Sequence, residues 1–218
     1  MTSASPLLKK AGRGKTWPLH ALLILASLVT IGPFLWMILT SFKTYEESIL
    51  IPPTLLPASW NLANYQIVLG KFPFGAFYFN TFAMVGMAIL GQLIVCSMAA
   101  YAFARLKWPG RDLFFLILLS TMMLPAQVTM IPVFLVFKQL GWYNSLKPLW
   151  VPAFLGTPFF IFMLRQFMKG IPKSLEEAAR IDGCGYFGTY RQIILPLMKP
   201  ALAAVGIFTF MGTWNEFM

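Results

Sequence analysis

Long apolar stretches alternate with short charged connections along this sequence. A helix needs about 20 apolar residues to cross a bilayer, and five stretches meet or approach that length. They predict an all-α, polytopic transmembrane helix bundle over residues 19–218, preceded by a polar tail at residues 1–18. The five stretches are Leu19–Phe42, Phe72–Ala104 with its helix at Phe79–Phe103, Leu113–Phe137, Leu149–Leu164 with an extension to Met168, and Ala201–Phe217.

Prolines mark the positions where this regular pattern should break. A run of turn-forming residues that includes Pro52, Pro53 and Pro57 predicts irregular or extended backbone in the connection 43–78. Prolines also kink membrane helices, whose freed backbone groups are satisfied by neighbouring helices. Kinks are therefore expected in the third and fourth stretches, either as packing geometry or as the lining of a path, at Pro125, Pro132, Pro152 and Pro158.

Lysine and arginine are distributed unevenly between the connections, and cytoplasmic connections carry an excess of both. The tail has four, the connection 104–112 has three and the connection 165–200 has six, whereas 43–78 and 138–148 have two each. The alternation predicts a cytoplasmic N-terminus and places the connection 165–200 on the same side.

Composition agrees with a membrane protein. The chain is 58% hydrophobic and 11% charged, with a mean hydropathy of +0.71, whereas soluble domains carry about 25% charged residues. The net charge of +10 follows the connections, so it indicates topology and does not suggest nucleic acid as a partner. The single His20 predicts no metal site. Cys96 and Cys184, at different expected membrane depths, predict no disulfide.

The connection 165–200 has the most specific local design. Ser174-Leu-Glu-Glu177 has the pattern of a capping box, and a helix from about Leu175 to Asp182 is expected to follow. Gly183 then stands where a left-handed C-terminal cap belongs. With a second segment at Tyr186–Ile194, the connection predicts a helix, a tight turn and another helix on the cytoplasmic face.

The first of these helices has a face suited to docking on another protein. Leu175, Ala178 and Asp182 share one side by helical spacing, and the small Ala178 and Ala179 let a partner surface approach the backbone. An ordinary loop helix at the membrane surface is the alternative interpretation. The wider pattern E-A-A-x-x-x-G-x9-I-x-L-P is far more specific than E-A-A alone. It fixes Glu177, Ala178, Ala179, Gly183, Ile193, Leu195 and Pro196.

This pattern resembles the cytoplasmic signature of permease subunits in binding-protein-dependent ATP-binding-cassette (ABC) importers. The chain is similar to the carbohydrate-uptake class of these permeases from the first apolar stretch to its end. The matching segments are Pro125–Pro132, Leu164–Phe167, Ile171–Pro172, Leu175–Gly183 and Thr213–Phe217. The family usually has alanine where this chain has Cys184, and it continues into a sixth span, so we expect this sequence to be incomplete.

The resemblance implies that the segment Glu177–Gly183 is a coupling helix, which would sit in a groove of an ATPase subunit and move when ATP closes the ATPase dimer. ATP and Mg would be held by that partner, and this chain would bind no cofactor. The implied setting is a bacterial or archaeal inner membrane, and the solute is a sugar or a sugar-like molecule. The implied partners are two ABC ATPase subunits, a second and non-identical permease subunit, and an extracytoplasmic solute-binding protein. The residues assigned to coupling are Glu177, Ala178, Ala179, Asp182, Gly183, Ile193, Leu195 and Pro196.

Polar side chains inside the apolar stretches are candidates for the translocation path. Buried amides in a membrane often bond between helices, but they could also contact sugar hydroxyls. Glu216 is the only acid in an expected span, and it is either functional or simply at the interface. The candidates are Asn80, Gln92, Gln127, Thr129 and Glu216.

Two other classes of membrane protein fit the sequence less well. An ion-coupled secondary transporter, or a channel subunit, is the alternative function, but the first four stretches hold no ionisable group beyond His20 at an edge. A membrane enzyme would need a nucleophile and base or a set of metal ligands, and the sequence has one histidine and no clustered acids in its spans. The sequence also lacks the phosphate-binding G-x-x-x-x-G-K-[ST] motif, so ATP hydrolysis is expected on a separate subunit.

Overall fold

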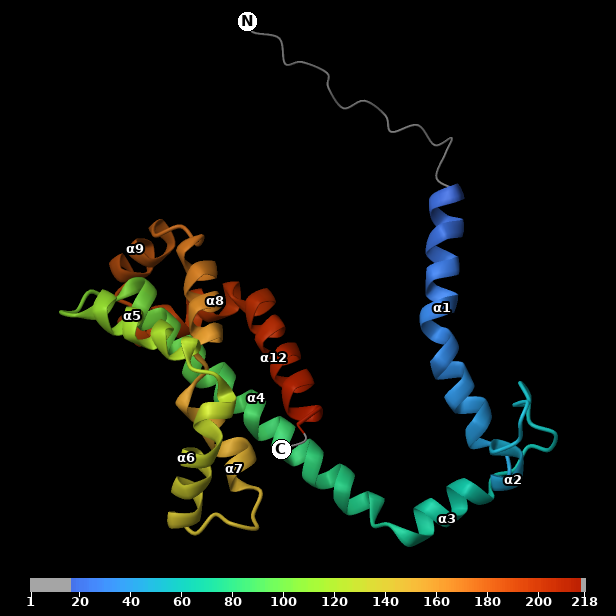
Figure 1. The fold of residues 1–218 in the computed structure, drawn as a ribbon. Helices are drawn as coiled ribbons and strands as arrows, with labels where there is room; N and C mark the ends of the chain where they lie inside the picture. The colour runs from blue at the N-terminus through green and yellow to red at the C-terminus, as the bar shows by residue number, and fades with distance from the viewer. Residues whose placement is uncertain (1–16, 217–218) are drawn as a thin grey trace, which may run out of the picture. The chain divides into compact units, whose positions relative to one another are not determined.

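The computed structural model describes residues 17–216. Of the predicted tail, only Trp17 and Pro18 are among the described residues. Phe217, at the end of the fifth stretch, also lies outside them. Every regular element of residues 17–216 is a helix (Figure 1). The chain divides into two compact units, residues 1–74 and residues 75–218, which are described in turn.

The first unit begins with one long apolar helix. α1 spans Trp17–Ser41, 25 residues, and none of its residues is buried within the chain. An apolar helix without a core of its own is the pattern of a membrane span covered by lipid or by other subunits. It matches the first predicted stretch. Two shorter helices follow in the same unit, α2 at Tyr45–Ser48 and α3 at Ala63–Lys71.

The connection after α1 is held together by polar contacts. The Lys43 ammonium donates to the carbonyl of Thr54, and Glu47 Oε1 accepts from Thr54 Oγ1 and from the backbone N–H of Ala58, both at 2.9 Å. The segment between α2 and α3 is irregular, as its prolines predicted. The helix α3 was not predicted, because the run of turn-forming residues behind that expectation extends to Asn64, the second residue of α3.

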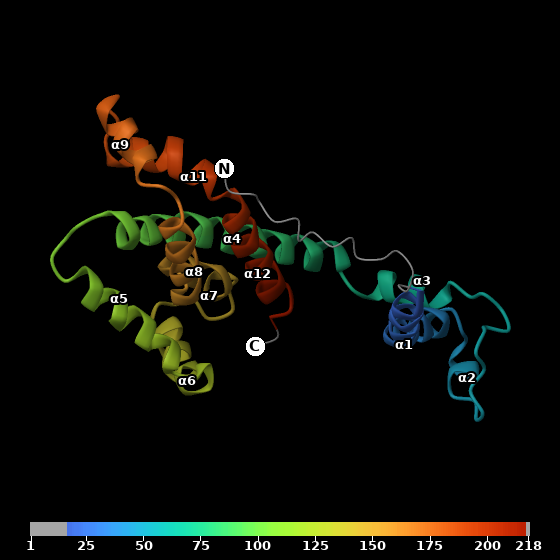
Figure 2. The same cartoon turned by 90° about the horizontal axis from the view of Figure 1, so that it is seen from above.

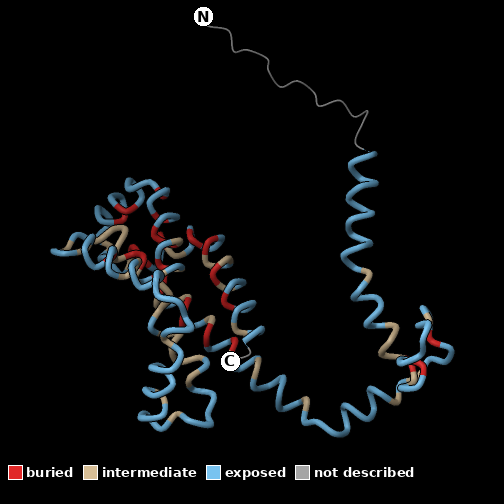
Figure 3. Tube along the Cα trace, in the orientation of Figure 1, coloured by how far each residue is buried: buried red, intermediate tan, exposed pale blue. Residues whose placement is uncertain are grey.

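The second unit is organised around α4, Phe74–Arg105, a helix of 32 residues. It extends the predicted Phe79–Phe103 at both ends. Its buried positions recur every three or four residues along one side, and the buried core lies along the C-terminal half of α4 (Figure 3). Fully buried side chains of this core come from α4, from α8 and from the segment that runs from η3 to α12, which includes Met198 between α11 and α12. They include Cys96, Leu164, Met168, Ile194, Met198 and Val205.

The third predicted stretch is a bent pair of helices. α5 at Arg111–Ser120 and η1 at Thr121–Met123 meet α6, Ala126–Gln139, at an angle of 101°. Leu124 adopts extended backbone (φ −81°, ψ 118°) directly before Pro125, because proline disfavours helical backbone in the residue before it. The kink was predicted at Pro125, and its size is that of a broken helix.

The remaining stretches are also interrupted. The fourth comprises α7 at Lys147–Trp150, η2 at Val151–Leu155 and α8 at Pro158–Lys169, with Gly156 between η2 and α8 at a φ of +79°. The fifth is α12, Lys199–Trp214, which meets the preceding helical segment at 76°. Figure 2 shows α8 and α12 beside α4 from above.

By length and composition, three helical segments of the described chain could each cross a membrane. These are Trp17–Ser41, Phe74–Arg105 and Lys147–Lys169. The number rises to five if each bent pair forms one span. Each of the five predicted stretches corresponds to one of these segments or pairs.

Candidate functional site

The connection between α8 and α12 folds into short helices at one end of the second unit, where α9 projects beyond α8 (Figures 1 and 2). The predicted order of helix, turn and helix is present. α9 spans Ser174–Ile181, followed by a turn at Asp182–Gly185. The second helical segment runs through α10 at Tyr186–Thr189, a π-helical turn η3 at Tyr190–Ile194, and α11 at Leu195–Leu197.

The turn after α9 has the geometry of a Schellman motif. Gly183 has a φ of +83°, and its N–H bonds the carbonyl of Arg180 at 3.0 Å while the N–H of Cys184 bonds the carbonyl of Ala179 at 2.9 Å. These two bonds satisfy carbonyls that the helix end leaves free. The left-handed cap predicted at Gly183 is confirmed, and it sets the angle between the two helical segments.

The capping box predicted at Ser174–Glu177 is wrong. Lys173 is the N-cap residue, its backbone is already helical (φ −67°, ψ −25°), and no side chain caps the helix. A capping side chain requires an N-cap residue with non-helical backbone, whereas Ser174 is the first residue of α9. The carbonyl of Lys173 instead accepts from the N–H groups of Glu176 and Glu177, at 2.9 and 3.0 Å.

α9 has one face turned into the protein and one turned out. Glu176 and Ala179 are buried, whereas the predicted docking face of Leu175, Ala178 and Asp182 is exposed. Ile181 extends the exposed face and is 87% exposed. Ala179 was predicted, with Ala178, to let a partner surface approach the backbone. It lies on the buried face of α9, turned toward the rest of this chain. The exposed face is thus apolar and acidic, with Glu177 beside it.

A buried ion pair anchors the inner face of α9. Arg105 Nε, at the end of α4, lies 2.8 Å from Glu176 Oε1, and the two side chains are 4% and 8% exposed. Arg105 Nη2 also donates to the carbonyls of Met168 and Ile171, both at 2.6 Å. One guanidinium therefore ties the end of α8 and the start of α9 to α4.

The sequence reasoning assigned no site role to Arg105 or Glu176. Arg105 entered only the count of positive charges that predicts the topology, and Glu177 was the acid assigned to the motif. Adjacent residues differ by about 100° around the axis of a helix, so one of two neighbouring acids can face inward while the other faces outward. The long-range partner itself has no signature in a single sequence.

Tyrosine side chains hold the second helical segment, Tyr186–Leu197, against α4. Tyr190 Oη lies 2.7 Å from Ser97 Oγ, and Tyr101 Oη donates to the carbonyl of Tyr186 at 3.3 Å. The rings of Tyr101 and Tyr190 are 5.3 Å apart. The segment is thus held by two residues of α4 one helical turn apart.

The I-x-L-P part of the motif lies on this second segment. Ile193 and Leu195 are half-buried on either side of the fully buried Ile194, and Pro196 is exposed. Ile194 belongs to the core of the second unit, and Leu195 packs against it.

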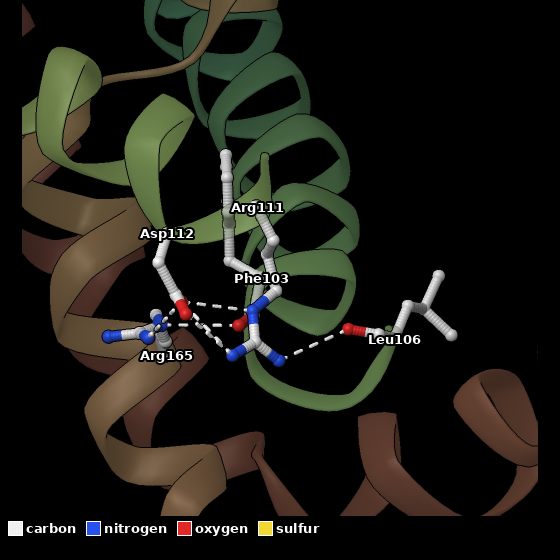
Figure 4. A network of polar contacts seen from close by, with 5 residues as sticks. All are labelled: Phe103, Leu106, Arg111, Asp112 and Arg165. Atoms are coloured by element: carbon white, nitrogen blue, oxygen red, sulfur yellow. Dashed lines mark hydrogen bonds and ion pairs between the residues drawn. The ribbon is translucent and has the colours of Figure 1, made fainter. Parts of the chain in front are cut away.

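A second polar network joins α8 to the connection between α4 and α5 (Figure 4). Arg111 donates twice to Asp112, at 3.0 and 3.1 Å, and Arg165 Nη2 lies 3.8 Å from Asp112 Oδ1. Arg165 Nε also donates to the carbonyl of Phe103 at 3.2 Å, and its guanidinium stacks 4.0 Å from the centre of the Phe115 ring. The connections 104–112 and 165–200 therefore lie at the same end of the unit, as the positive charges predicted.

The polar residues predicted for a translocation path are not brought together. Gln92 is buried, where its Nε2 donates to Thr157 Oγ1 at 2.8 Å and its Oε1 accepts from the Thr157 N–H at 3.2 Å. Asn80 and Gln127 are exposed, and Thr129 bonds back to the Ala126 carbonyl at 3.0 Å.

Glu216 lines a separate, mostly apolar cavity of about 570 Å³. α6 contributes most of its wall, including Met130, Phe134 and Phe137, and Leu149 of α7 adds to it. Within residues 17–216, no three histidine, cysteine or acidic side chains are grouped as metal ligands.

Together, the apolar helices and the anchored loop define a polytopic helical membrane protein. A family model described as "Binding-protein-dependent transport system inner membrane component" matches residues 92–218. The chain belongs to this family, and the match includes the whole of the α9 loop.

Individual relatives extend the comparison over most of the chain. The "Diacetylchitobiose uptake system permease protein NgcG" of Streptomyces coelicolor is 35% identical over 201 residues, which cover 91% of this chain and 66% of that protein. The "Putative ABC transporter permease protein ORF2" of Caldicellulosiruptor sp. is 37% identical over 193 residues, covering 88% of this chain and 70% of the relative. The chain thus spans about two thirds of the length of these relatives.

A solved structure has the same fold. It is the crystal structure of a bacterial ABC transporter involved in the import of the acidic polysaccharide alginate. The TM-score is 0.83 at 26% sequence identity, with 98% of this chain and 75% of the other chain covered.

Proposed function

We propose that this chain is a permease subunit of an ATP-driven, binding-protein-dependent importer for a sugar or sugar-like solute. The observation that carries the proposal is the structure of α9. It is a short helix that ends in a Schellman turn, and its inner face is anchored by an ion pair while its outer face is exposed. Membership of the transport-system family and the similarity to uptake permeases support it.

In this proposal α9 is the coupling helix. Its exposed face, with Leu175, Ala178, Ile181 and Asp182, docks on an ABC ATPase subunit, and Glu177 offers a negative charge at the edge. The Arg105–Glu176 pair makes α9 and α4 move as one body, so closure of the ATPase dimer reaches the core of the bundle through α4. Hydrolysis of ATP, with its Mg, belongs to the ATPase subunits.

The remaining partners follow from the same assignment. Two ATPase subunits drive a pair of permease subunits, this chain and a non-identical sister, and an extracytoplasmic solute-binding protein delivers the solute. The N-terminus and the α9 loop are cytoplasmic in this arrangement. The names of relatives that take up diacetylchitobiose and arabinooligosaccharides favour an oligosaccharide as the solute.

An affinity purification from native membranes tests the proposal. The chain is tagged at its N-terminus on the chromosome, solubilised in mild detergent and purified, and the retained proteins are identified by mass spectrometry. We expect an ABC ATPase subunit, a second permease and a solute-binding protein. Retention of the intact chain with none of these would contradict the proposed function.

A further inference from the structure

A positively charged cavity lies beside α9 in the second unit. It has a volume of about 360 Å³ and is lined by five cationic side chains and two carboxylates. The cations come from two separate parts of the sequence, the connection between α4 and α5 and the segment that forms α9. The cavity therefore lies between the α4–α5 connection and α9, which are far apart in the sequence.

Two of the five cations already have carboxylate partners. Arg105 pairs with Glu176 at 2.8 Å, and Arg111 pairs with Asp112. The ammonium groups of Lys107 and Lys173 make no hydrogen bond or ion pair with any part of the chain that the structure describes. Both ammonium groups are exposed and both line the cavity, so its excess positive charge is available to a ligand.

Arg180 and Tyr186 also line the cavity. The Arg180 guanidinium lies 4.8 Å from the centre of the Tyr186 ring, and its N–H groups make no hydrogen bond or ion pair within residues 17–216, so they are available to an acceptor. Glu177, the second carboxylate of the lining, is exposed. The lining keeps more cations than anions even when Glu177 is ionised.

The surroundings are those of a membrane interface. Tyr186 is 59% exposed, and the half-buried Trp108 follows Lys107 directly, where the apolar helices α4 and α5 end and begin. Tyrosine and tryptophan gather at the headgroup level of membranes, and basic pockets between helices on the cytoplasmic side bind anionic headgroups. A phosphodiester fits this combination of two free ammonium groups and a neighbouring guanidinium.

The geometry points to a binding site for the headgroup of an anionic phospholipid, held by Lys107 and Lys173 with Arg180 at its edge. Lys107 lies in the connection between α4 and α5, and Lys173 lies at the start of α9. A headgroup bound by both lysines therefore holds α9 against α4, in addition to the Arg105–Glu176 pair. The lipid composition of the membrane then adjusts how firmly α9 is held. The inference rests on the proposed cytoplasmic placement of this loop but not on transport.

Native mass spectrometry of the purified complex tests the site. The complex is stripped of lipid and incubated with equal amounts of phosphatidylglycerol and phosphatidylcholine, and the lipid molecules retained on each species are counted. We expect a preference for phosphatidylglycerol, and a loss of roughly 25-fold in that preference for the double variant Lys107→Gln/Lys173→Gln, since each of the two cations near an anionic surface strengthens binding by about fivefold. The matched control is Lys138→Gln/Lys147→Gln, which removes two exposed lysines from the opposite connection and should keep the preference.

Four outcomes would overturn the inference. Equal retention of the two lipids by the unsubstituted protein would do so, as would an unchanged preference in the double variant. Displacement of the lipid by inorganic phosphate at similar concentration would assign the cavity to free phosphate. Cross-links from Lys107 and Lys173 to the ATPase would assign it to the partner protein. Recovery of the ATPase and sister permease in the same preparation reports on the proposed function separately, because the lipid count needs no transport.

Discussion

Arg105 at the end of α4 and Glu176 in the first turn of α9 form a buried ion pair with a separation of 2.8 Å. The adjacent Glu177 is exposed. Two neighbouring carboxylates of one short helix thus have different tasks, one holding the helix to its own chain and the other facing outward.

Removing the charge of Glu176 should destabilise the protein. Glu176→Gln leaves the Arg105 guanidinium buried without its counter-charge, and breaking a buried pair in this way costs about 3–5 kcal/mol. Thermal unfolding of the purified complex should show a clear drop in melting temperature. The control is Glu177→Gln, an exposed change expected to stay within about 0.5 kcal/mol. Equal melting temperatures for the two variants would contradict an anchoring role for the pair.

Gly183→Val should disturb the turn between the two helical segments. The φ of +83° is costly for any residue with a Cβ, by about 1–2 kcal/mol and more when the side chain is β-branched. Since a Cβ at this position would meet no atom within 4 Å, the cost comes from the backbone alone, and Gly183→Asn should recover part of it. The measurement is ATPase activity stimulated by solute and binding protein. Gly185→Ala is the control, because Gly185 has a φ of −73°; a loss there equal to that of Gly183→Val would refute the explanation.

A charge placed on the outer face of α9 should weaken association with the ATPase. Ile181→Glu changes a side chain that is 87% exposed, so the stability of the permease should barely change. Loss of a docked apolar anchor commonly costs about 2 kcal/mol or more, which corresponds to roughly 30-fold weaker binding. Co-purification of the ATPase measures the effect. Tyr143→Glu, a change at another exposed side chain (72%) in the connection 138–148, should retain the ATPase; normal recovery with Ile181→Glu would rule out docking through this face.

Cys184 offers a direct measurement of orientation. It is partly exposed beside the Schellman turn, whereas Cys96 is buried in the core. A membrane-impermeant maleimide should label the protein in inside-out vesicles and leave it unlabelled in right-side-out ones. Cys184→Ser should abolish the signal, which identifies the reacting thiol. Labelling only from the outer side would reverse the proposed topology.

Gln92→Leu separates a packing role from a solute-binding role. The amide links α4 to Thr157 by two hydrogen bonds, and interhelical bonds of this kind contribute about 0.6–2 kcal/mol. We expect a lower melting temperature for Gln92→Leu and no change for Gln127→Leu, whose side chain is exposed. Reduced uptake by Gln92→Leu at an unchanged melting temperature would instead indicate contact with the solute.

Local pattern and tertiary packing determined different parts of this structure. The apolar stretches, the break at Pro125 and the turn at Gly183 follow from properties of a few neighbouring residues, and all were visible in the sequence. The start of α9 was misjudged because Lys173 takes helical backbone, which a favourable Ser174–Glu177 spacing could not reveal. The pairing of Arg105 with Glu176 depends on how α4 and α9 pack, so no local signal could identify it.

The abrupt end of α5 and η1 before α6 limits what can surround this part of the chain. A membrane-buried break interrupts the ladder of backbone hydrogen bonds, and lipid cannot replace the missing partners. Leu124 and Pro125 are both exposed in the isolated chain, so within a bilayer they require contact with water or with another polypeptide. The corner at Leu124–Pro125 therefore marks a side of the subunit that faces either an aqueous route or a neighbouring subunit, while the continuous helix α1, which has no buried residue, is free to face the acyl chains.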